Sequence, residues 1–338
     1  MDEHSYPGDQ RSLLVLWPTG RCNLECRYCY AAGVSSQDMD LATACQAIDR
    51  MEGPLSIQFA GGEPLLNIGL VEAACAYAAA RHDDVLFSIQ TNGSLIDRQA
   101  IEVIKRYRIA IGVSLDGRPE TNEHLRGDTF EVIKGINSLY AAGLAININA
   151  VVSNYNALRL TELVDMAVFF GNVNGIGLDL LRASGLGAGP QASLKQAAGD
   201  DLRQGLIHLY AYARQINAGL AQKVIIREFE KARILWQAKQ PPPAYCYAAQ
   251  GRSFVVLPNG DCYPCGSLAH DRGYFMGNIH DSFQALAIAC DRPEGCSSCE
   301  YGGFCPGGCP ARGLLDGGFD ELDCVMRKTS FDLIKEEA

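Results

Sequence analysis

The sequence predicts an α/β protein with a parallel sheet, followed by a small region rich in cysteine. Over the first 230 residues, six apolar runs alternate with stretches in which apolar residues recur at helical spacing. Nine of the 14 cysteines then lie between residues 246 and 324. A series of β/α units indicates parallel strands joined by right-handed crossovers. The units are too few to close a standard β/α barrel, and a doubly wound sheet fits the same spacing.

The strands are predicted from near-continuous apolar runs, which are typical of parallel strands buried on both faces. They cover residues 13–17, 55–59, 85–91, 109–115, 145–152 and 177–181. Helices are predicted between them over residues 40–52, 67–82, 97–107, 129–142 and 157–170. After a glycine-rich loop that begins at Ser184, two further helices are predicted over 199–218 and 223–239. Short strands at 253–257 and 262–263, joined by a turn at 258–260, complete the prediction.

A domain boundary is predicted near residue 240, where the composition changes and Gln240 is followed by three prolines. The first domain covers residues 10–239, and the second covers 240–338 and ends in a helix. The apolar content of the second domain is too low for a core of its own. We therefore expect metal sites to stabilise it.

Charge and hydropathy exclude several classes of protein. The net charge is −10 and there is no run of Lys or Arg, so a nucleic-acid partner is not expected. No apolar stretch is long enough to span a membrane, and the acidic N-terminus lacks the apolar segment of a secretory signal. We expect a cytoplasmic protein whose cysteines serve a metal or catalytic role and do not form disulfides.

Cys22, Cys26 and Cys29 form a C-x3-C-x2-C motif directly after the first predicted strand. Three thiolates on one loop can hold three irons of a [4Fe–4S] cubane and leave the fourth iron open to another ligand. The alternatives are a structural zinc site, which needs a fourth Cys or His that this loop lacks, and chance clustering.

This segment, including Tyr28 before the third cysteine, resembles the signature of the radical S-adenosylmethionine (SAM) superfamily. The resemblance implies a partial (β/α)6 TIM-like barrel, a SAM molecule chelated by the open iron, and reductive cleavage of SAM to a 5′-deoxyadenosyl radical. A second match follows the second predicted strand, and the resemblance implies that its backbone and carboxylate hold the SAM amino group. It consists of Gly61, Gly62, Glu63 and Pro64.

Polar residues at the ends of the later strands match the same family, at the barrel mouth where ligands bind. By resemblance, Ser114 and Arg126 face the SAM carboxylate, and Gln90 or Asp116 lies near the ribose or the substrate. Asn92 is a further cofactor-binding candidate. Asp116 and Asp179 are the candidate catalytic residues, and Asn149 and Arg182 are expected to line the mouth. For each of them, an ordinary turn, cap or strand-end role is the alternative.

The C-terminal cysteines resemble the SPASM extension of radical SAM enzymes, which holds two auxiliary [4Fe–4S] clusters. By resemblance, Cys296, Cys299, Cys305 and Cys324 bind one cluster, and Cys246, Cys265 and Cys309 supply three ligands to the other. We expect Cys262 to complete the second set, since it forms a C-x2-C pair with Cys265; the alternatives are an open iron or Cys290 as a further candidate ligand. Cys45 and Cys75 are expected to be buried core thiols. Zinc knuckles are the alternative for the whole region.

The resemblance implies an enzyme with SAM and three [4Fe–4S] clusters that modifies a peptide or protein by crosslinking, oxidation or epimerisation. Anaerobic sulfatase maturation is a second hypothesis, although Gly266 stands where those enzymes have an Asp after the cysteine. An iron–sulfur electron carrier or a zinc-binding interaction module is a third. Expected partners are the substrate and a low-potential donor such as flavodoxin or ferredoxin. Because only 21 residues precede Cys22, we expect either a separate protein that binds a leader peptide or direct binding of the substrate by the barrel mouth and the loop at 183–199.

Overall fold

The computed structural model describes residues 10–189, 192–240, 244–289 and 291–337. The prolines of the expected domain boundary and Cys290 therefore lie outside the described residues. The six expected strands are present as β1 (Ser12–Leu16), β2 (Leu55–Phe59), β3 (Val85–Thr91), β4 (Ala110–Ser114), β5 (Ile146–Val152) and β6 (Val173–Leu180). They pair in sequence order and all are parallel. The prediction of a partial α/β barrel is confirmed.

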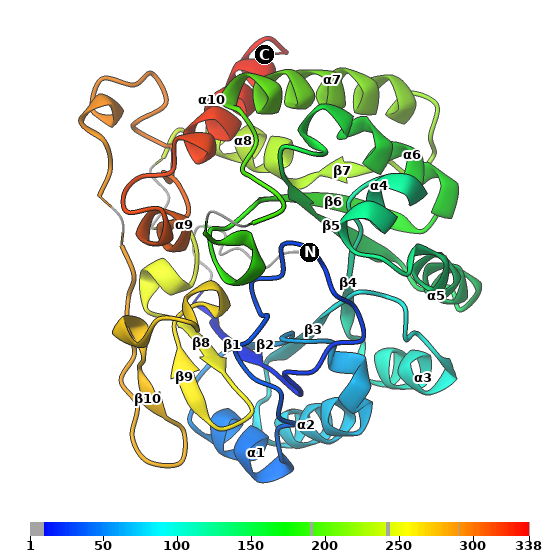
Figure 1. Cartoon of the computed structure of the whole chain (residues 1–338), viewed down its shortest axis with the longest axis vertical. Helices are drawn as coiled ribbons and strands as arrows, with labels where there is room; N and C mark the ends of the chain where they lie inside the picture. Colours follow the sequence, from blue (N-terminus) through cyan, green and yellow to red (C-terminus); the bar gives the residue numbers. More distant parts are fainter. Residues whose placement is uncertain (1–9, 190–191, 241–243, 290, 338) are drawn as a thin grey trace.

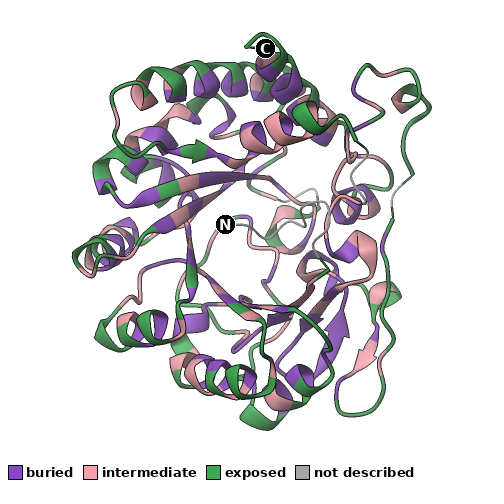
Figure 2. Cartoon of the chain, turned by 180° about the vertical axis from the view of Figure 1, so that it is seen from behind, coloured by how far each residue is buried: buried purple, intermediate pink, exposed green. Residues whose placement is uncertain are grey.

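Helices cover the outside of this curved sheet (Figure 1). They are α1 (Leu41–Asp49), α2 (Ile68–Arg81), α3 (Arg98–Tyr107), α5 (Thr129–Ala141) and α6 (Thr161–Phe170). Two of them begin at aspartate caps, because Asp40 and Asp97 accept backbone hydrogen bonds from the first turns of α1 and α3. A further short helix, α4 (Pro119–Leu125), follows β4 and was not expected from the periodicity. Figure 2 shows that the strands are largely buried, whereas the outer faces of the helices are exposed.

The sheet continues beyond the six expected strands on both sides. The segment expected to begin a helix at 223 first forms a short strand, β7 (Ile225–Ile226), which pairs with β6 before α8 (Arg227–Ala238) begins. At the other edge, β8 (Ser253–Val256) pairs in parallel with β1 and leads to β9 (Asp261–Tyr263) and β10 (Gly277–Asn278). The sheet therefore runs across residue 240, and the division of the chain there remains a prediction from composition.

The C-terminal region shares the barrel's core as well as its sheet. Its helices are α9 (Pro310–Leu315) and α10 (Glu321–Lys335), and α10 packs on α8 and on α7 (Gly199–Asn217). Tyr301 stacks on Phe331, and Phe304 packs edge-on against both rings; all three belong to the same buried cluster as the barrel strands. None of the helices in the described part of the chain has the length and apolar character that a bilayer span requires.

The two isolated cysteines differ in burial. Cys75, on α2, is fully buried in the core as expected. Cys45, on α1, is only partly buried, so the expectation of a core thiol is wrong at this position. The reason is its place on the helix, since Ala44, Ala47 and Ile48 form the buried face and Cys45 lies at its border.

Candidate active site

A cavity of about 400 Å³ lies at the carboxyl ends of the strands, between the barrel and the C-terminal region. Residues on β1 to β6 and in the loops after them line it, together with residues on and after α8, after β9, at the start of α9 and on α10. Most of the expected site residues reach it: Cys22, Cys26, Tyr28, Cys29, Gly61, Gly62, Glu63, Gln90, Asn92, Ser114, Arg126, Asp179, Cys246, Cys265 and Cys309. Its lining thus includes two separate groups of three thiols.

The loop of Cys22, Cys26 and Cys29 crosses the mouth and is held by backbone hydrogen bonds from residues 61–63. The amide of Gly62 donates to Thr19 O (3.1 Å), and that of Glu63 donates to Arg21 O (2.8 Å). A Cβ at Gly62 would lie 2.0 Å from Arg21 O, and Gly61 has φ of +111°. Both positions therefore require glycine, because the two loops could not otherwise approach each other.

The carboxylate of Glu63 is 1% exposed and joins the loop after β2 to the end of β3. Its Oε1 accepts hydrogen bonds from Leu65 N (3.0 Å) and Thr91 Oγ1 (2.7 Å), and its Oε2 accepts one from Asn92 N (2.8 Å). Burial nonetheless raises the pKa of Glu63 to about 7, because the three donors compensate only part of the desolvation. A cation in the cavity beside Oε2 would favour the charged form.

We predict that Glu63 makes the cluster-free protein less stable as the pH rises. Its folded pKa, about 7, lies above the unfolded value of 4.5. The folded state therefore holds the proton more tightly, and this contribution is complete below pH 4.5 and lost as the pH rises to about 7. The loss amounts to roughly 3 kcal/mol. Urea unfolding of Glu63→Gln at pH 5 and 8 should lack this change, whereas the exposed Glu102→Gln control should retain it. The prediction would be contradicted if the free energy of unfolding changed equally between pH 5 and pH 8 in the wild type, Glu63→Gln and Glu102→Gln.

Gln90, Ser114 and Asn149 form a polar row across β3, β4 and β5 on the inner face of the barrel. Gln90 Nε2 donates to Ser114 Oγ (2.9 Å), and Asn149 Nδ2 donates to Gln90 Oε1. Asn92, directly after β3, donates to Asn23 Oδ1 (3.0 Å), with Cys22 Sγ 3.9 Å away. The row places amide and hydroxyl groups along one wall of the cavity, beside the cysteine loop.

Asp116 does not line the cavity and is fully buried beneath it. Its carboxylate accepts hydrogen bonds from Tyr28 Oη, from Val151 N (2.8 Å), and from the guanidinium of Arg126 (2.9 and 3.1 Å). These contacts occupy both oxygens, so Asp116 has no free position for a reacting group. The geometry instead gives it the role of holding Arg126, which does line the cavity.

Cys246, Cys265 and Cys309 form the second group of three thiols in the cavity. Burial raises the pKa of Cys246 to about 12 and also raises the pKa of Cys309; the nearby Cys265 adds to both shifts, and Cys309 adds to that of Cys246. Buried, clustered thiols of this kind are held as thiolates only by a bound cation. The residues present therefore fit a metal cluster.

Cys262 is not brought to this group. It is fully buried in the main core and packs with Val256, Met276 and Ile279, while the other three thiols contact a separate small cluster. Cys262 lies on β9 and Cys265 beyond the strand's end, so the C-x2-C spacing does not form a chelating turn here. The three thiols thus face the cavity without Cys262.

Cys262→Ala is expected to leave the iron content of the purified protein unchanged. Cys265→Ala is the matched variant and should lower it by about four atoms, the content of one cubane. Iron and sulfide analysis of the two variants measures the difference. A loss of iron in Cys262→Ala equal to that in Cys265→Ala would contradict the placement of Cys262 in the core.

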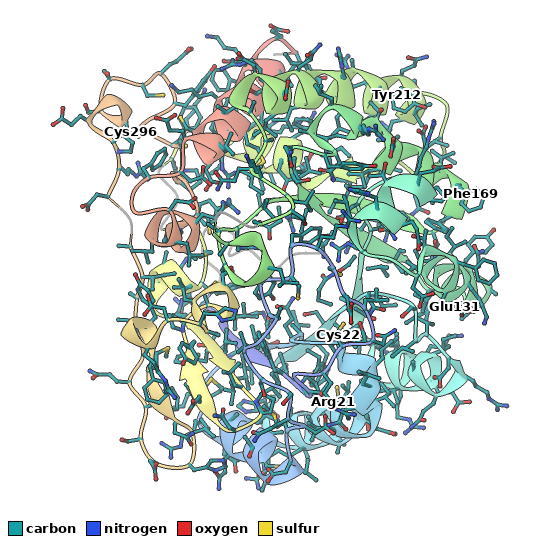
Figure 3. All side chains as sticks on the ribbon, in the orientation of Figure 1. Arg21, Cys22, Glu131, Phe169, Tyr212 and Cys296 are labelled. Carbon is teal, nitrogen blue, oxygen red and sulfur yellow. The ribbon has the colours of Figure 1, made fainter. Side chains whose placement is uncertain are left out.

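A third group of thiols lies at the outer edge of the C-terminal region. Cys324 on α10 interacts electrostatically with Cys296, Cys299 and Cys305. Figure 3 shows Cys296 at this edge, well separated from Cys22 within the ring of strands. Among the described residues, no three Cys, His, Asp or Glu side chains converge closely enough for a single metal ion.

Asp179 is held by two arginines, Arg182 of the barrel and Arg312 of the C-terminal region. Arg182 binds one of its oxygens and Arg312 Nη1 binds the other (2.8 Å), while Arg312 also pairs with the buried Asp323. Burial would raise the pKa of Asp179, but the two arginines hold it below its ordinary value. Asp179 therefore stays ionised and is a weak proton acceptor.

Two further cavity residues were not expected from the sequence. Tyr30 lies between the two thiol groups, since its ring interacts with Cys29, Cys265 and the guanidinium of Arg182. Arg312 is 2% exposed and follows Cys309 by three residues. The sequence offered only a weak signal for either residue. Tyr30 is an aromatic residue directly after a candidate ligand cysteine, and Arg312 is a cation within a short, mainly apolar segment.

A family model described as "Radical SAM superfamily" matches residues 18–167. An uncharacterised protein of Methanocaldococcus jannaschii, MJ0907, is 31% identical over 299 residues, covering 85% of this chain and 95% of the relative. The chain belongs to the radical SAM superfamily. The resemblance carried by residues 22–30 and 61–64 is thereby confirmed.

Other members of the radical SAM superfamily resemble the whole chain. A serine-type anaerobic sulfatase-maturating enzyme of Klebsiella aerogenes is 26% identical, covering 88% of this chain and 79% of the relative. The solved structure of anSMEcpe with AdoMet and a peptide superposes with a TM-score of 0.80 at 21% identity, covering 97% of each chain. This second likeness confirms the fold, including the region after residue 240.

Proposed function

We propose that this radical SAM protein cleaves SAM reductively and abstracts hydrogen from a peptide or protein substrate in the described cavity. The observation that carries the proposal is one cavity lined both by the Cys22–Cys26–Cys29 loop and by Cys246, Cys265 and Cys309. A substrate placed between the two groups would lie beside a SAM-binding centre and an auxiliary centre. Relatives named as peptide- or protein-modifying enzymes support this assignment.

The residues of the barrel mouth fit the expected cofactors. Cys22, Cys26 and Cys29 would hold a [4Fe–4S] cluster with one open iron, and the carboxylate of Glu63 lies beside Cys22 to accept an ammonium group. When bound, the cluster and SAM supply a carbon-centred radical that removes hydrogen from the substrate.

The chain's own residues orient the reactants. Arg126, held in place by Asp116, presents a guanidinium to the cavity that suits the SAM carboxylate. The polar row of Gln90, Ser114 and Asn149 offers hydrogen bonds to hydroxyl groups. The apolar side chains of Trp17, Val15 and Leu178 also line the cavity and limit access of water to a radical.

Sulfatase maturation is a less favoured alternative. Gly266 lines the cavity where a proton-accepting Asp would be needed, and its nearest neighbours are the rings of Trp17 and Tyr30. Asp179 does not replace it, because its two arginine partners keep its pKa low. Crosslinking, other oxidations and epimerisation remain the broader class of reaction that we propose.

The test is anaerobic reconstitution with iron and sulfide, followed by reduction with dithionite in the presence of SAM. We expect about twelve irons per chain, for three cubanes, and formation of 5′-deoxyadenosine. A sulfatase peptide containing C-x-P-x-R should not gain formylglycine. Absence of 5′-deoxyadenosine from fully reconstituted protein would favour the electron-carrier alternative, and zinc in place of iron would favour the interaction module.

A further inference from the structure

The buried carboxylate of Asp323 connects the two groups of thiols in the C-terminal region. We call these groups inner and outer; the inner group is Cys246, Cys265 and Cys309, and the outer group is Cys296, Cys299, Cys305 and Cys324. Asp323 directly precedes Cys324 in the first turn of α10, and its side chain is 0% exposed. Its Oδ2 accepts a hydrogen bond of 2.8 Å from the backbone N–H of Cys309. One carboxylate therefore contacts the backbone of an inner cysteine and adjoins an outer cysteine in the chain.

The approach of Asp323 to Cys309 depends on the glycine at position 308. A Cβ on Gly308 would lie 3.0 Å from Asp323 Cβ and 3.1 Å from Asp323 Oδ2. Side chains at such distances have to move apart by a few tenths of an ångström. The φ of Gly308 is not positive, so its backbone conformation does not itself require glycine. Glycine at this position thus allows the carboxylate to reach the Cys309 amide.

Asp323 also binds the guanidinium of Arg312, which lies beside the inner group. Arg312 follows Cys309 by three residues on α9 and interacts with that thiol electrostatically. Its Nε donates to Asp323 Oδ2 (3.1 Å), and its Nη2 donates to Asp323 Oδ1. Asp323 therefore engages two donors next to the inner group, one amide and one guanidinium.

The other charged groups around Asp323 do not share its contact with a cysteine. Asp179 and Asp320 pair with Arg312 at 2.8 and 3.1 Å, and Arg327 interacts with Asp323 electrostatically from one turn further along α10. In the described part of the chain, Asp323 is the only carboxylate that accepts a hydrogen bond from the backbone of a candidate cluster ligand. Its effect on the inner group can therefore be separated from that of its neighbours.

Two physical effects of Asp323 on an inner cluster act in the same direction. A hydrogen bond to a cluster sulfur stabilises the reduced, more negative state and raises the reduction potential, whereas a nearby negative charge lowers it. Asp323 places a carboxylate beside Cys309 and keeps the Cys309 amide bound to an oxygen. Without this carboxylate, the same amide could donate to sulfur.

We propose that Asp323 is a positioning residue that lowers the reduction potential of the inner auxiliary cluster by retaining the Cys309 amide. This inference rests on the proposed function, which places a [4Fe–4S] cluster on the inner thiols. In the redox step, the cluster core takes up one electron from the reductant and passes from the 2+ to the 1+ state, and no covalent bond forms or breaks. A lower potential makes the reduced inner cluster pass its electron on more readily.

The test is a reductive titration of reconstituted holoenzyme with dithionite and redox mediators, followed by electron paramagnetic resonance. The signal of the inner cluster is identified by its absence from Cys265→Ala. In Asp323→Asn, the reduction equilibrium of the inner cluster should shift about tenfold toward the reduced state, a rise of about 59 mV for one electron. The SAM-binding cluster should titrate as in the wild type, because Asp323 contacts none of its cysteines.

Gly308→Ala separates the hydrogen bond from the charge. It pushes the carboxylate away from the Cys309 amide and keeps the charge of Asp323, so the potential of the inner cluster should rise and that of the outer cluster should not change. This variant decides the question if Asp323→Asn fails to retain its iron. Titration of the inner cluster at the wild-type potential in Gly308→Ala would then overturn the proposal.

Asp320→Asn is the matched control for the loss of a buried carboxylate. It removes a charge that pairs with Arg312, whereas asparagine still caps α10 in its place. An unchanged inner potential in Asp323→Asn overturns the proposal, and so does an equal rise in Asp320→Asn, which would make net charge the cause. If all three clusters are present but dithionite and SAM yield no 5′-deoxyadenosine, the proposed function fails, while the potentials still test the role of Asp323.

Discussion

Cys29→Ala is expected to abolish 5′-deoxyadenosine formation and to remove about four of about twelve irons. Cys29 is the third thiol of the loop at the barrel mouth and lines the cavity with Cys22 and Cys26. Without it, two thiols remain, which is too few to hold a cubane with a single open iron. The measurements are iron and sulfide analysis after anaerobic reconstitution, and product formation with dithionite and SAM.

The matched control for this prediction is Cys45→Ala. Cys45 is partly buried on α1 and belongs to none of the three thiol groups, so its removal should change neither iron content nor product formation. Electron paramagnetic resonance of the reduced proteins should show one signal fewer in Cys29→Ala only. Full product formation by Cys29→Ala would contradict the assignment of this loop as the SAM-binding centre.

Arg312→Met is expected to have the largest effect on stability. The guanidinium is 2% exposed and pairs with Asp179, Asp320 and Asp323, of which Asp323 is fully buried. Removing the cation leaves these carboxylates without their counter-charge, and breaking a buried pair in this way costs about 3–5 kcal/mol. Urea unfolding at neutral pH measures the change in the free energy of unfolding.

Two variants distinguish this ion network from a simple loss of packing. Arg312→Met/Asp323→Asn should recover part of the stability, since one of the unpaired charges is then removed as well. Arg98→Met, at an arginine whose side chain is 93% exposed, should stay within about 0.5 kcal/mol of the wild type. If the double variant is less stable than Arg312→Met, the loss comes from packing and not from the unpaired charge.

Local patterns in the sequence were sufficient for the barrel. The strands are rich in apolar residues and could be recognised from them, although most alternate buried with half-buried positions, as residues 55–59 do, and each covering helix shows its own periodicity. The patterns failed at two segments: a helix was expected from residue 223, where a strand forms first, and no helix was expected over residues 119–125. Ile225 and Ile226 form a strand because β6 offers an edge to pair with, and α4 is too short to show a period.

The candidate site was predictable where function depends on close spacing along the chain. The C-x3-C-x2-C motif and residues 61–64 lie on single loops, so the positions of their side chains follow from the sequence. Cys262 shows the opposite case, because its spacing from Cys265 is that of a ligand pair. The direction of β9 nevertheless turns Cys262 into the main core and away from the cavity.

The cysteine-rich region was expected to be a separate domain that metal sites stabilise, because its apolar content is low. In the structure, β8 pairs with β1, and Phe304 and Phe331 belong to the same buried cluster as the barrel strands. Composition describes the residues of one segment, whereas the burial of those residues depends on which other segments of the chain pack against them. The division near residue 240 therefore stays a prediction from composition.

The sequence by itself determined the order of β/α units, the family, and the loop that presents Cys22, Cys26 and Cys29. Only the tertiary structure decided that Cys246, Cys265 and Cys309 share a cavity with that loop, and that Asp179 and Asp116 are held by arginines. The physical reason is the range of the interactions. Hydrophobic periodicity and loop motifs act between near neighbours in the chain, whereas the partners of a buried charge or thiol come from distant segments that only the fold brings together.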